Sequence, residues 1–291
     1  MPDWIEETRT LTASDGYPLH CRFWRPSNAA IQARILILHG IQSHAGWYES
    51  LGRTLAEHGI ETAMPDRRGS GANASDRGHA RSPGQLLEDI DIVYRSWRES
   101  SGDSKFKPYL GGISWGGKLA VASAATRPGQ WAGLSLIAPG LFAKVRPPFS
   151  MQIRIALAAL IRPRKQFPIP LADPALFTSD PHWQNFIATD ERTLHKASAR
   201  FFVTSRIFDL RLRRYARRLG CPVLLQLAGA DRIVNNDRTK DYINSAKTAK
   251  PTILEYPGAH HTLEFEAGEV SRRYAEDLAR WIKEKAITSA G

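Results

Sequence analysis

The chain has 291 residues, of which 42% are hydrophobic, and a formal net charge of +11. This length fits one large α/β domain or two smaller ones, and the apolar content argues against intrinsic disorder. No stretch offers the roughly 18 consecutive apolar residues of a membrane span, and the acidic N-terminus lacks the pattern of a signal peptide, so we expect a cytoplasmic protein. Cys21 and Cys221 are too few for a disulfide framework or a metal site, and we expect both to be buried.

The first half of the chain alternates apolar segments of strand length with helical patterns, which is typical of βαβ units on a largely parallel sheet. An Asp15-Gly16 turn predicts an antiparallel hairpin at the start. The expected strands are residues 8–12, 19–24, 34–38, 61–64, 108–110 and 134–137. The expected helices are residues 47–58, 84–98 and 117–125.

This alternation stops between residues 139 and 219, a proline-rich stretch with helical patches but no clear buried strand. Strands are expected again at 222–227 and 251–256, followed by a final amphipathic helix at 269–285. We therefore predict an α/β core formed by residues 1–139 and 220–291, and a helical cap inserted at residues 140–219.

Positive charge is concentrated in the predicted cap. Between Lys144 and Arg218 there are 15 Lys and Arg but only 5 Asp and Glu, so ten of the eleven net charges lie there. Residues 151–164 combine an apolar body with arginines at 154, 162 and 164, which suits a helix on a lipid surface or a lid with solvated arginines. The cap is a candidate for peripheral contact with anionic lipid, whereas no nucleic-acid-binding fold is recognisable.

The segment Gly112-Ile113-Ser114-Trp115-Gly116 follows an apolar run. A serine with glycine two residues away on each side suits a sharp strand-to-helix turn that exposes a nucleophilic hydroxyl. Glycine tolerates the dihedrals and close contacts of such a turn. The pattern also fits a glycine-rich turn with an ordinary capping serine, so its interpretation depends on the partners that follow.

Those partners follow in a consistent order. Asp231 comes just after the strand at 222–227, and adjacent His260 and His261 come just after the strand at 251–256. The carboxyl ends of parallel strands share one sheet edge, and the order Ser, Asp, His is that of α/β-hydrolases. Ser114 would attack a carbonyl, a histidine would move the proton, and Asp231 would orient the histidine. Asp237 is the alternative acid, better suited to a helix start, and the pattern alone does not choose between the histidines.

An oxyanion hole needs two donors aimed at the developing negative charge. The backbone N–H of Trp115 is one candidate, because it directly follows the nucleophile at a helix start. The other is the N–H of Ile41, with Gln42 next, in the loop after the strand at 34–38. His39 and His44 in that loop fit packing and loop hydrogen bonds better than metal ligation. No metal site is predicted.

Residues 258–263 (GAHHTL), His39-Gly40, and residues 66–71 (DRRGSG) together resemble the monoacylglycerol lipase and lysophospholipase-like α/β-hydrolases, also grouped with serine aminopeptidases. The resemblance covers nearly the whole chain. It implies a mostly parallel central sheet with helices on both faces and an inserted cap, and ester hydrolysis through an acyl-enzyme without a cofactor. It places the catalytic histidine on His261 and leaves His260 as a neighbour.

Two residues depart from the family pattern: Trp115 stands where the family often has methionine, and Ile41-Gln42 replaces a smaller pair. Both are expected to intrude on the acyl site. The prediction is a serine carboxylester hydrolase acting on small-molecule or lipid esters, specifically medium to long acyl esters of glycerol or a similar alcohol. A thioesterase, an amidase or aminopeptidase, and a cofactor-free perhydrolase remain open on the same triad. A catalytically silent binding protein would have no need for the complete triad.

Overall fold

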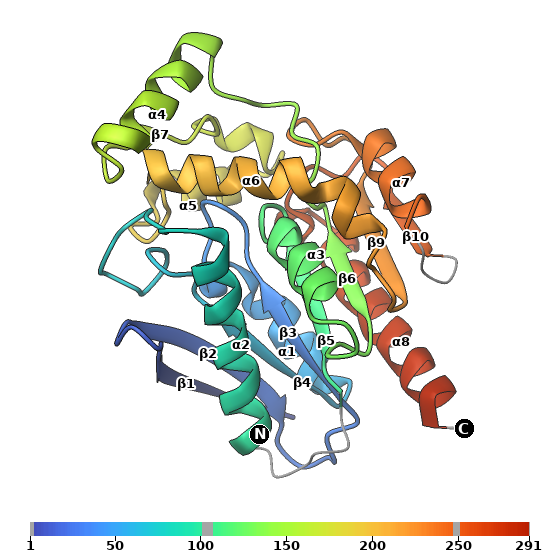
Figure 1. Ribbon diagram of the computed structural model, residues 1–291. Helices are drawn as coiled ribbons and strands as arrows, with labels where there is room; N and C mark the ends of the chain where they lie inside the picture. The colour runs from blue at the N-terminus through green and yellow to red at the C-terminus, as the bar shows by residue number, and fades with distance from the viewer. Residues whose placement is uncertain (1–2, 101–106, 247–250, 291) are drawn as a thin grey trace.

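A single eight-stranded sheet organises the protein, whose computed structural model describes residues 3–100, 107–246 and 251–290 (Figure 1). The strand order is β1-β2-β4-β3-β5-β6-β9-β10. β1 pairs antiparallel with β2, and β2 pairs antiparallel with β4, while every other neighbouring pair is parallel. The strands are β1 (Trp4–Thr12), β2 (Pro18–Pro26), β3 (Ala33–Leu38), β4 (Ile60–Pro65), β5 (Tyr109–Ile113), β6 (Leu134–Ile137), β9 (Val223–Ala228) and β10 (Thr252–Tyr256). The predicted opening hairpin and mostly parallel sheet are confirmed.

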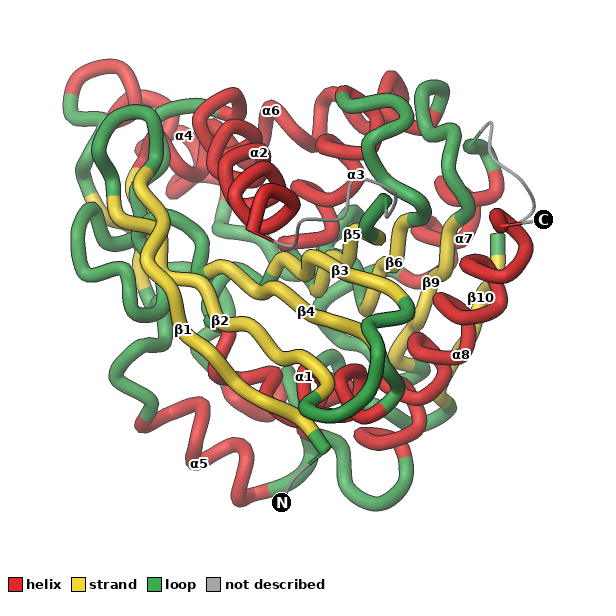
Figure 2. Tube along the Cα trace, turned by 90° about the horizontal axis from the view of Figure 1, so that it is seen from below, coloured by secondary structure: helices red, strands yellow, loops and turns green. Residues whose placement is uncertain are grey.

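Helices cover both faces of the sheet, as Figure 2 shows with α2 and α3 on one side and α1 and α8 on the other. The core helices are α1 (Glu49–Glu57), α2 (Pro83–Ser100), α3 (Gly116–Thr126), α7 (Asn236–Asn244) and α8 (Val270–Ala290). β3 shows why the central strands are mostly apolar: Ile35 and Ile37 pack toward α1 and α8, whereas Leu36 and Leu38 pack toward α2 and α3. A strand covered on both faces is largely apolar, and the one charged side chain of β3, Arg34, is paired with Glu61 of β4.

The segment between β6 and β9, called the cap below, lies over the carboxyl ends of the parallel strands (Figure 1). Its helices are α4 (Phe149–Ile161), α5 (Pro181–Thr189) and α6 (Ala199–Ala216). It also contains two short strands, β7 (Gln166–Pro168) and β8 (Lys196–Ser198), which pair antiparallel. The sequence shows no clear buried strand in this segment, and these two strands, of three residues each, are too short to show a period. The cap limits at 140 and 219 stay a prediction.

Several element ends differ from the predicted ones. The helix expected at 47–58 begins with a 3₁₀ turn at Ala45–Tyr48 and continues as α1; further 3₁₀ turns lie at Pro174–Leu176 and Leu263–Phe265. The cap helix expected to reach residue 164 ends at Ile161, because Pro163 disfavours helical dihedrals at Arg162. Cys21 is buried as expected, but Cys221 is only half-buried.

Among the described residues, none of the helices combines the length and apolar character that crossing a bilayer requires.

Candidate active site

Ser114 occupies a sharp turn between β5 and α3. Its φ of +52° lies in the left-handed region, which is uncommon for a residue with a side chain. The flanking glycines are required by close approaches: a Cβ on Gly116 would lie 2.1 Å from the Leu38 carbonyl oxygen, and one on Gly112 would lie 2.7 Å from the Ala120 Cβ. The strained turn thus presents the serine hydroxyl at the carboxyl edge of the sheet, as a nucleophile elbow does.

The structure brings Ser114, His261 and Asp231 together in one hydrogen-bonded chain. His261 Nε2 lies 2.8 Å from Ser114 Oγ, and His261 Nδ1 lies 2.7 Å from Asp231 Oδ2. The other oxygen of Asp231 accepts hydrogen bonds from the backbone N–H groups of Ile233 at 2.7 Å and Val234 at 3.0 Å. The carboxylate therefore orients the imidazole while its own position is held by the turn after β9.

The environment of Asp231 favours its charged form. Burial raises the pKa of this carboxyl, but the charge and hydrogen bond of His261 and the N–H groups of Val234 and Ile233 outweigh burial and hold the pKa below its ordinary value. An ionised carboxylate beside the imidazole stabilises the protonated histidine that forms when Ser114 gives up its proton.

The other two candidates lie elsewhere. Asp237 is in the first turn of α7, with 93% of its side chain exposed, as expected for a helix-start residue. His260 faces Glu266 instead, with its Nδ1 3.3 Å from Glu266 Oε1. Of the adjacent histidines, only His261 reaches Ser114.

The two predicted oxyanion donors border the nucleophile. The loop after β3 approaches so closely that a Cβ on Gly40 would lie 3.3 Å from Ser114 Cβ. Ile41 and Trp115 both line the cavity that opens beside Ser114. Within the described ranges, neither backbone N–H donates a hydrogen bond to the protein, so both are available to a substrate oxygen. Of the residues expected to intrude on the acyl site, Ile41 and Trp115 thus border the cavity, whereas Gln42 is not part of its lining.

Sequence reasoning missed Arg67, which holds the loop after β3. Its guanidinium donates to the carbonyl oxygens of Gly40 and Ile41, both at 2.9 Å, and lies 4.9 Å from the centre of the Trp115 ring. Burial lowers the pKa of Arg67 to about 9. Turning these two carbonyls toward Arg67 directs the adjoining N–H groups away from it. Arg67 lies in the DRRGSG segment, but only the fold shows what it contacts.

The same loop is tied to the cap through Asp190. His44 Nε2 and Trp47 Nε1 lie 2.9 Å and 2.8 Å from Asp190 Oδ2, and the Leu194 N–H donates to the Gln42 carbonyl oxygen at 2.9 Å. Burial opposes ionisation of Asp190, but hydrogen bonds from His44, Trp47 and the backbone hold its pKa well below the usual range. His44 thus has the loop hydrogen-bonding role expected from the sequence.

His39 has a similar role within the core. Its Nε2 accepts a hydrogen bond from the backbone N–H of Arg67 at 2.8 Å, which places the ring proton on Nδ1, facing the Gly40 carbonyl oxygen at 2.9 Å. Both ring nitrogens are therefore occupied by loop contacts.

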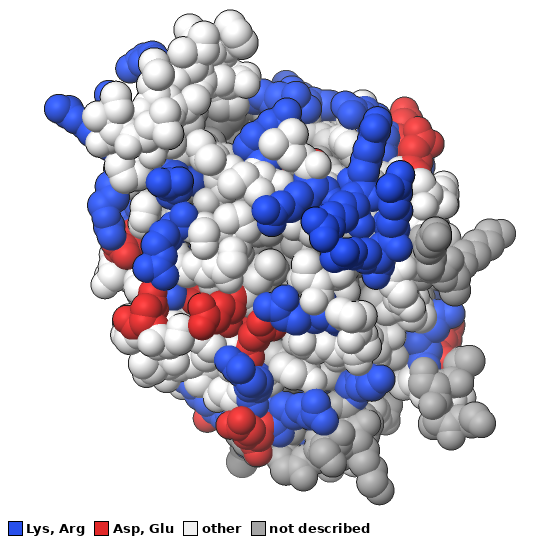
Figure 3. All heavy atoms as spheres, viewed as in Figure 1, with Lys and Arg blue, Asp and Glu red and all other residues white. Residues whose placement is uncertain are grey.

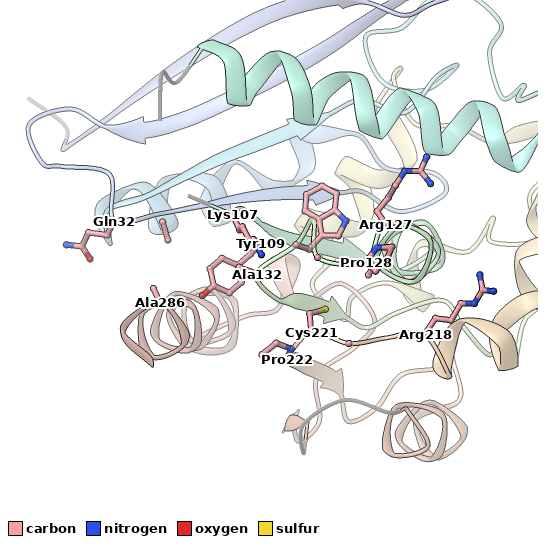
Figure 4. Close-up of a pocket in the computed structure, with 15 residues that line it drawn as sticks. Gln32, Lys107, Tyr109, Arg127, Pro128, Ala132, Arg218, Cys221, Pro222 and Ala286 are labelled. Atoms are coloured by element: carbon pink, nitrogen blue, oxygen red, sulfur yellow. The ribbon is translucent and has the colours of Figure 1, made fainter. Parts of the chain in front are cut away.

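The cavity beside Ser114 has a volume of about 540 Å³ and lies between the core and the cap. A larger cavity of about 820 Å³ lies at the opposite end of the sheet, where strands begin (Figure 4). Its described lining includes Tyr109, Arg127 and Cys221 but none of the predicted site residues. Only the smaller cavity gives a substrate access to a nucleophile with a base.

Comparison with known proteins agrees with this geometry. The sequence profile of the family described as "Serine aminopeptidase, S33" matches residues 29–268. Human monoglyceride lipase is 26% identical over 289 residues, covering 96% of this chain and 91% of that protein. A monoacylglycerol lipase of Mycolicibacterium smegmatis is 21% identical, covering 85% of this chain and 87% of that protein.

Solved structures share the fold. A soluble variant of Saccharomyces cerevisiae monoglyceride lipase, in complex with a substrate analog, superposes with a TM-score of 0.84 at 20% identity, covering 97% of this chain and 96% of that one. The monoacylglycerol lipase of Paleococcus ferrophilus gives a TM-score of 0.79 at 22% identity, covering 97% and 99%. The chain therefore belongs to the serine aminopeptidase S33 family and is an α/β-hydrolase of the monoacylglycerol lipase-like branch.

Proposed function

We propose that the protein is a serine carboxylester hydrolase that uses Ser114, His261 and Asp231 as a catalytic triad. The observation that carries the proposal is the continuous chain from Ser114 Oγ through both nitrogens of His261 to Asp231 Oδ2, with distances of 2.8 and 2.7 Å. A nucleophile, a base and an orienting acid within hydrogen-bonding reach define the arrangement that activates serine.

In the first half of the reaction, His261 Nε2 takes the proton of Ser114 as Oγ bonds to the ester carbonyl carbon. The N–H groups of Ile41 and Trp115 stabilise the negative charge on the carbonyl oxygen. The intermediate then breaks its bond to the alcohol, which leaves with the proton from His261, and an acyl-enzyme remains. In the second half, water attacks this acyl group and gives a proton to His261. The acid leaves, and Ser114 regains its proton.

The proposed substrates are medium to long acyl esters of glycerol or a similar alcohol. Support comes from the relatives named monoglyceride lipase and from apolar residues along the cavity, among them Ile155, Leu171 and Phe202. A cavity of about 540 Å³ has room for a chain of this kind. Residues 140–219 are proposed as the cap that encloses it.

Peripheral contact with a lipid surface is proposed for α4. Only Ile155 and Ala159 of this helix are buried. Its large apolar side chains face outward instead, with Phe149 77%, Leu160 82% and Ile161 78% exposed. Exposed arginines flank them, and an exposed apolar ridge with cationic borders suits an anionic lipid interface. Figure 3 shows a mostly uncharged projection at the upper left, where Figure 1 places α4, with Lys and Arg side chains at its edge.

Labelling with a fluorophosphonate probe tests the nucleophile. Wild-type protein is expected to form a stoichiometric adduct, and Ser114→Ala is expected to form none while retaining its thermal unfolding temperature. Persistent labelling of Ser114→Ala would refute the nucleophile, and unlabelled wild type in folded form would favour a binding protein. A panel of p-nitrophenyl esters, monoacylglycerols, thioesters and peptides then tests the substrate class. Turnover of thioesters or peptides with only weak ester hydrolysis would overturn the ester assignment.

A further inference from the structure

The cavity beside Ser114 has two chemically different ends, and they lie toward opposite ends of α6. At one end the wall comes from α4, the segment after β7 and the first half of α6. Apart from Gln152, its side chains there are apolar: Ile155, Ala156, Ile169, Leu171, Phe202 and Val203. At the other end the wall comes from α3, the middle of α6, the start of α7 and the segment between β6 and α4. It carries charged side chains (Lys118, Arg146, Arg206, Asp209 and Arg238) among apolar ones such as Phe142, Leu212 and Val234. Figure 1 shows that α6 runs across the molecule from the side where α4 lies to the side where α7 lies.

Lys118 is the most informative of these residues. It lies on α3 one turn after Ser114, and it is only 6% exposed. Its Nζ lies 2.6 Å from Asp209 Oδ1 on α6. Burying an ammonium group is costly unless a partner compensates it. A packing role alone would be served at lower cost by an apolar residue, such as the leucine and alanines that follow on α3.

Two neighbouring arginines of the cavity wall, Arg146 and Arg206, act electrostatically on Lys118. Burial lowers the pKa of Lys118 and Asp209 opposes this, while the charges of Arg146 and Arg206 lower the pKa further. Both arginines are therefore close enough to repel the Lys118 ammonium group. Asp209 is shared, since its Oδ2 lies 3.8 Å from Arg206 Nη1.

A single carboxylate does not balance this end of the cavity. Four of its lining side chains are cationic and only Asp209 is anionic, which leaves three positive charges in excess. Arg238 stacks over Phe142, with its guanidinium carbon 4.6 Å from the ring centre, and Arg146 donates to the Ala143 carbonyl oxygen at 3.1 Å. Neither arginine has a carboxylate within 4.0 Å among the described residues. Their charges are thus available to something outside the protein.

We propose that the site takes an ester carrying an anionic group, a carboxylate or a phosphate, held at the cationic end of the cavity while an apolar chain lies toward α4. This rests on the proposed function, because it names the substrate class of the same serine. The excess positive charge repels a free amino group, so it also opposes the aminopeptidase alternative. A buried cation beside partly exposed ones strengthens attraction to an anion, because the local dielectric is lower than that of water.

The test uses short soluble esters in matched neutral and anionic pairs. One pair, p-nitrophenyl pentanoate and p-nitrophenyl hydrogen glutarate, places the charge on the acyl side. The other pair, monobutyrylglycerol and its phosphate, places it on the alcohol side. At least one anionic ester is expected to have a kcat/KM about tenfold above its neutral partner, with the advantage shrinking in about 0.5 M salt. The pair that shows the preference identifies the side that carries the anion.

Variants connect the preference to the cavity. The double variant Arg206→Gln/Arg238→Gln is expected to lower the anionic-to-neutral ratio about fivefold. The matched control is Arg214→Gln, an exposed arginine of α6 that does not line the cavity, and it is expected to keep the ratio. Anionic esters hydrolysed no faster than neutral ones overturn the proposal. An equal effect of Arg214→Gln also overturns it, because the preference would then come from the overall charge of the protein.

A binding measurement separates this proposal from the proposed function. Calorimetry on Ser114→Ala compares octanoate and octyl phosphate with neutral octylglycerol, so no turnover is needed. If no ester is hydrolysed, the proposed function fails. Tighter binding of an anion that depends on Arg206 and Arg238 then still supports the cationic end, and equal binding of all three ligands refutes it.

Discussion

The core and the cap differ in the burial and pairing of their charged side chains. In the core, arginines near the sheet are buried and paired: Arg34 lies 2.7 Å from Glu61, and Arg68 lies 2.7 Å from Asp89. In the cap, three exposed arginines of α6 (Arg211, Arg213 and Arg214) and Arg217 just after it have no carboxylate within 4.0 Å in the described part of the chain. Figure 3 shows Lys and Arg gathered over the end of α6 near α7.

This difference suits a core that carries out catalysis and a cap that selects which molecules are bound. A catalytic group must hold one geometry, which needs paired charges and several hydrogen bonds around it. Cations of the cap that have no carboxylate partner remain able to attract an anionic substrate or surface. Changes in the core should therefore alter turnover or folding, whereas changes in the cap should alter which molecules are bound.

The largest effect is expected at Asp231. Asp231→Asn should lower kcat about 10⁴-fold with little change in fold, because an amide neither holds the reactive tautomer of His261 nor stabilises its charge. Steady-state hydrolysis of a p-nitrophenyl ester measures this. Asp237→Asn is the matched control, since Asp237 is exposed on α7, and it should stay within about twofold of wild type. A comparable loss in Asp237→Asn would contradict the assignment of the acid.

Glu264 should make core stability depend on pH. Its carboxylate is buried, accepting hydrogen bonds from the Tyr274 hydroxyl and the Leu51 N–H, and burial raises its pKa to about 7. The folded protein thus keeps a proton that the unfolded chain releases above about pH 4.5, so stability falls as pH rises toward and through 7. We expect a loss of about 1 to 3 kcal/mol from this group between roughly pH 5 and pH 8.

Urea unfolding of wild type and Glu264→Gln at both pH values measures this contribution. The variant keeps the size of the side chain but does not titrate, so its stability should depend less steeply on pH. An unchanged pH dependence in Glu264→Gln would assign the effect to other groups.

Arg67 lies where the core and the cap meet, and we expect its substitution to lower kcat rather than to raise KM. Arg67→Met removes the two hydrogen bonds to Gly40 and Ile41 but keeps an apolar stem against Trp115. We expect kcat to fall about 10- to 100-fold with KM changed about threefold or less, because a displaced oxyanion donor weakens transition-state binding most. Arg77→Met is the control, since Arg77 donates to the carbonyl oxygens of Gly71 and Arg192 away from Ser114. A change in KM alone would argue against the positioning role.

The smallest effect is expected on α4. Phe149→Ser/Leu160→Ser should lower binding to anionic lipid vesicles about tenfold at low salt, because two exposed apolar side chains no longer enter the interface. Co-sedimentation measures it, with Leu210→Ser on α6 as the control, since Leu210 is 69% exposed but lies on another helix. Equal binding of wild type to neutral and anionic vesicles would sink the electrostatic part of the proposal, and an equal loss in the control would move the contact away from α4.

Local patterns were sufficient for most of the core. The parallel strands, the hairpin and the nucleophile elbow could be predicted from apolar periodicity and turn residues within short segments of the chain. The two strands of the cap could not be recognised in the sequence, because strands of three residues leave little periodic signal. The predicted end of α4 came too late, because the predicted segment continued past Arg162, where Pro163 disfavours helical dihedrals. The contacts of Arg67 and Asp190 join residues far apart in the chain, so no local pattern could indicate them.

The sequence by itself determined the fold class, and it identified Ser114, Asp231 and His261 as candidates that could meet, because residues after parallel strands share one sheet edge. The pattern of residues left His260 and His261 open, the family resemblance pointed to His261, and the tertiary structure shows that His261 faces Ser114. Only the tertiary structure decided that α4 presents its apolar side chains outward. The structure alone also placed Lys118 among the cations of the cavity. The orientation of a side chain and the balance of charges around a cavity depend on packing between segments that are distant in sequence. Local sequence patterns do not indicate that packing.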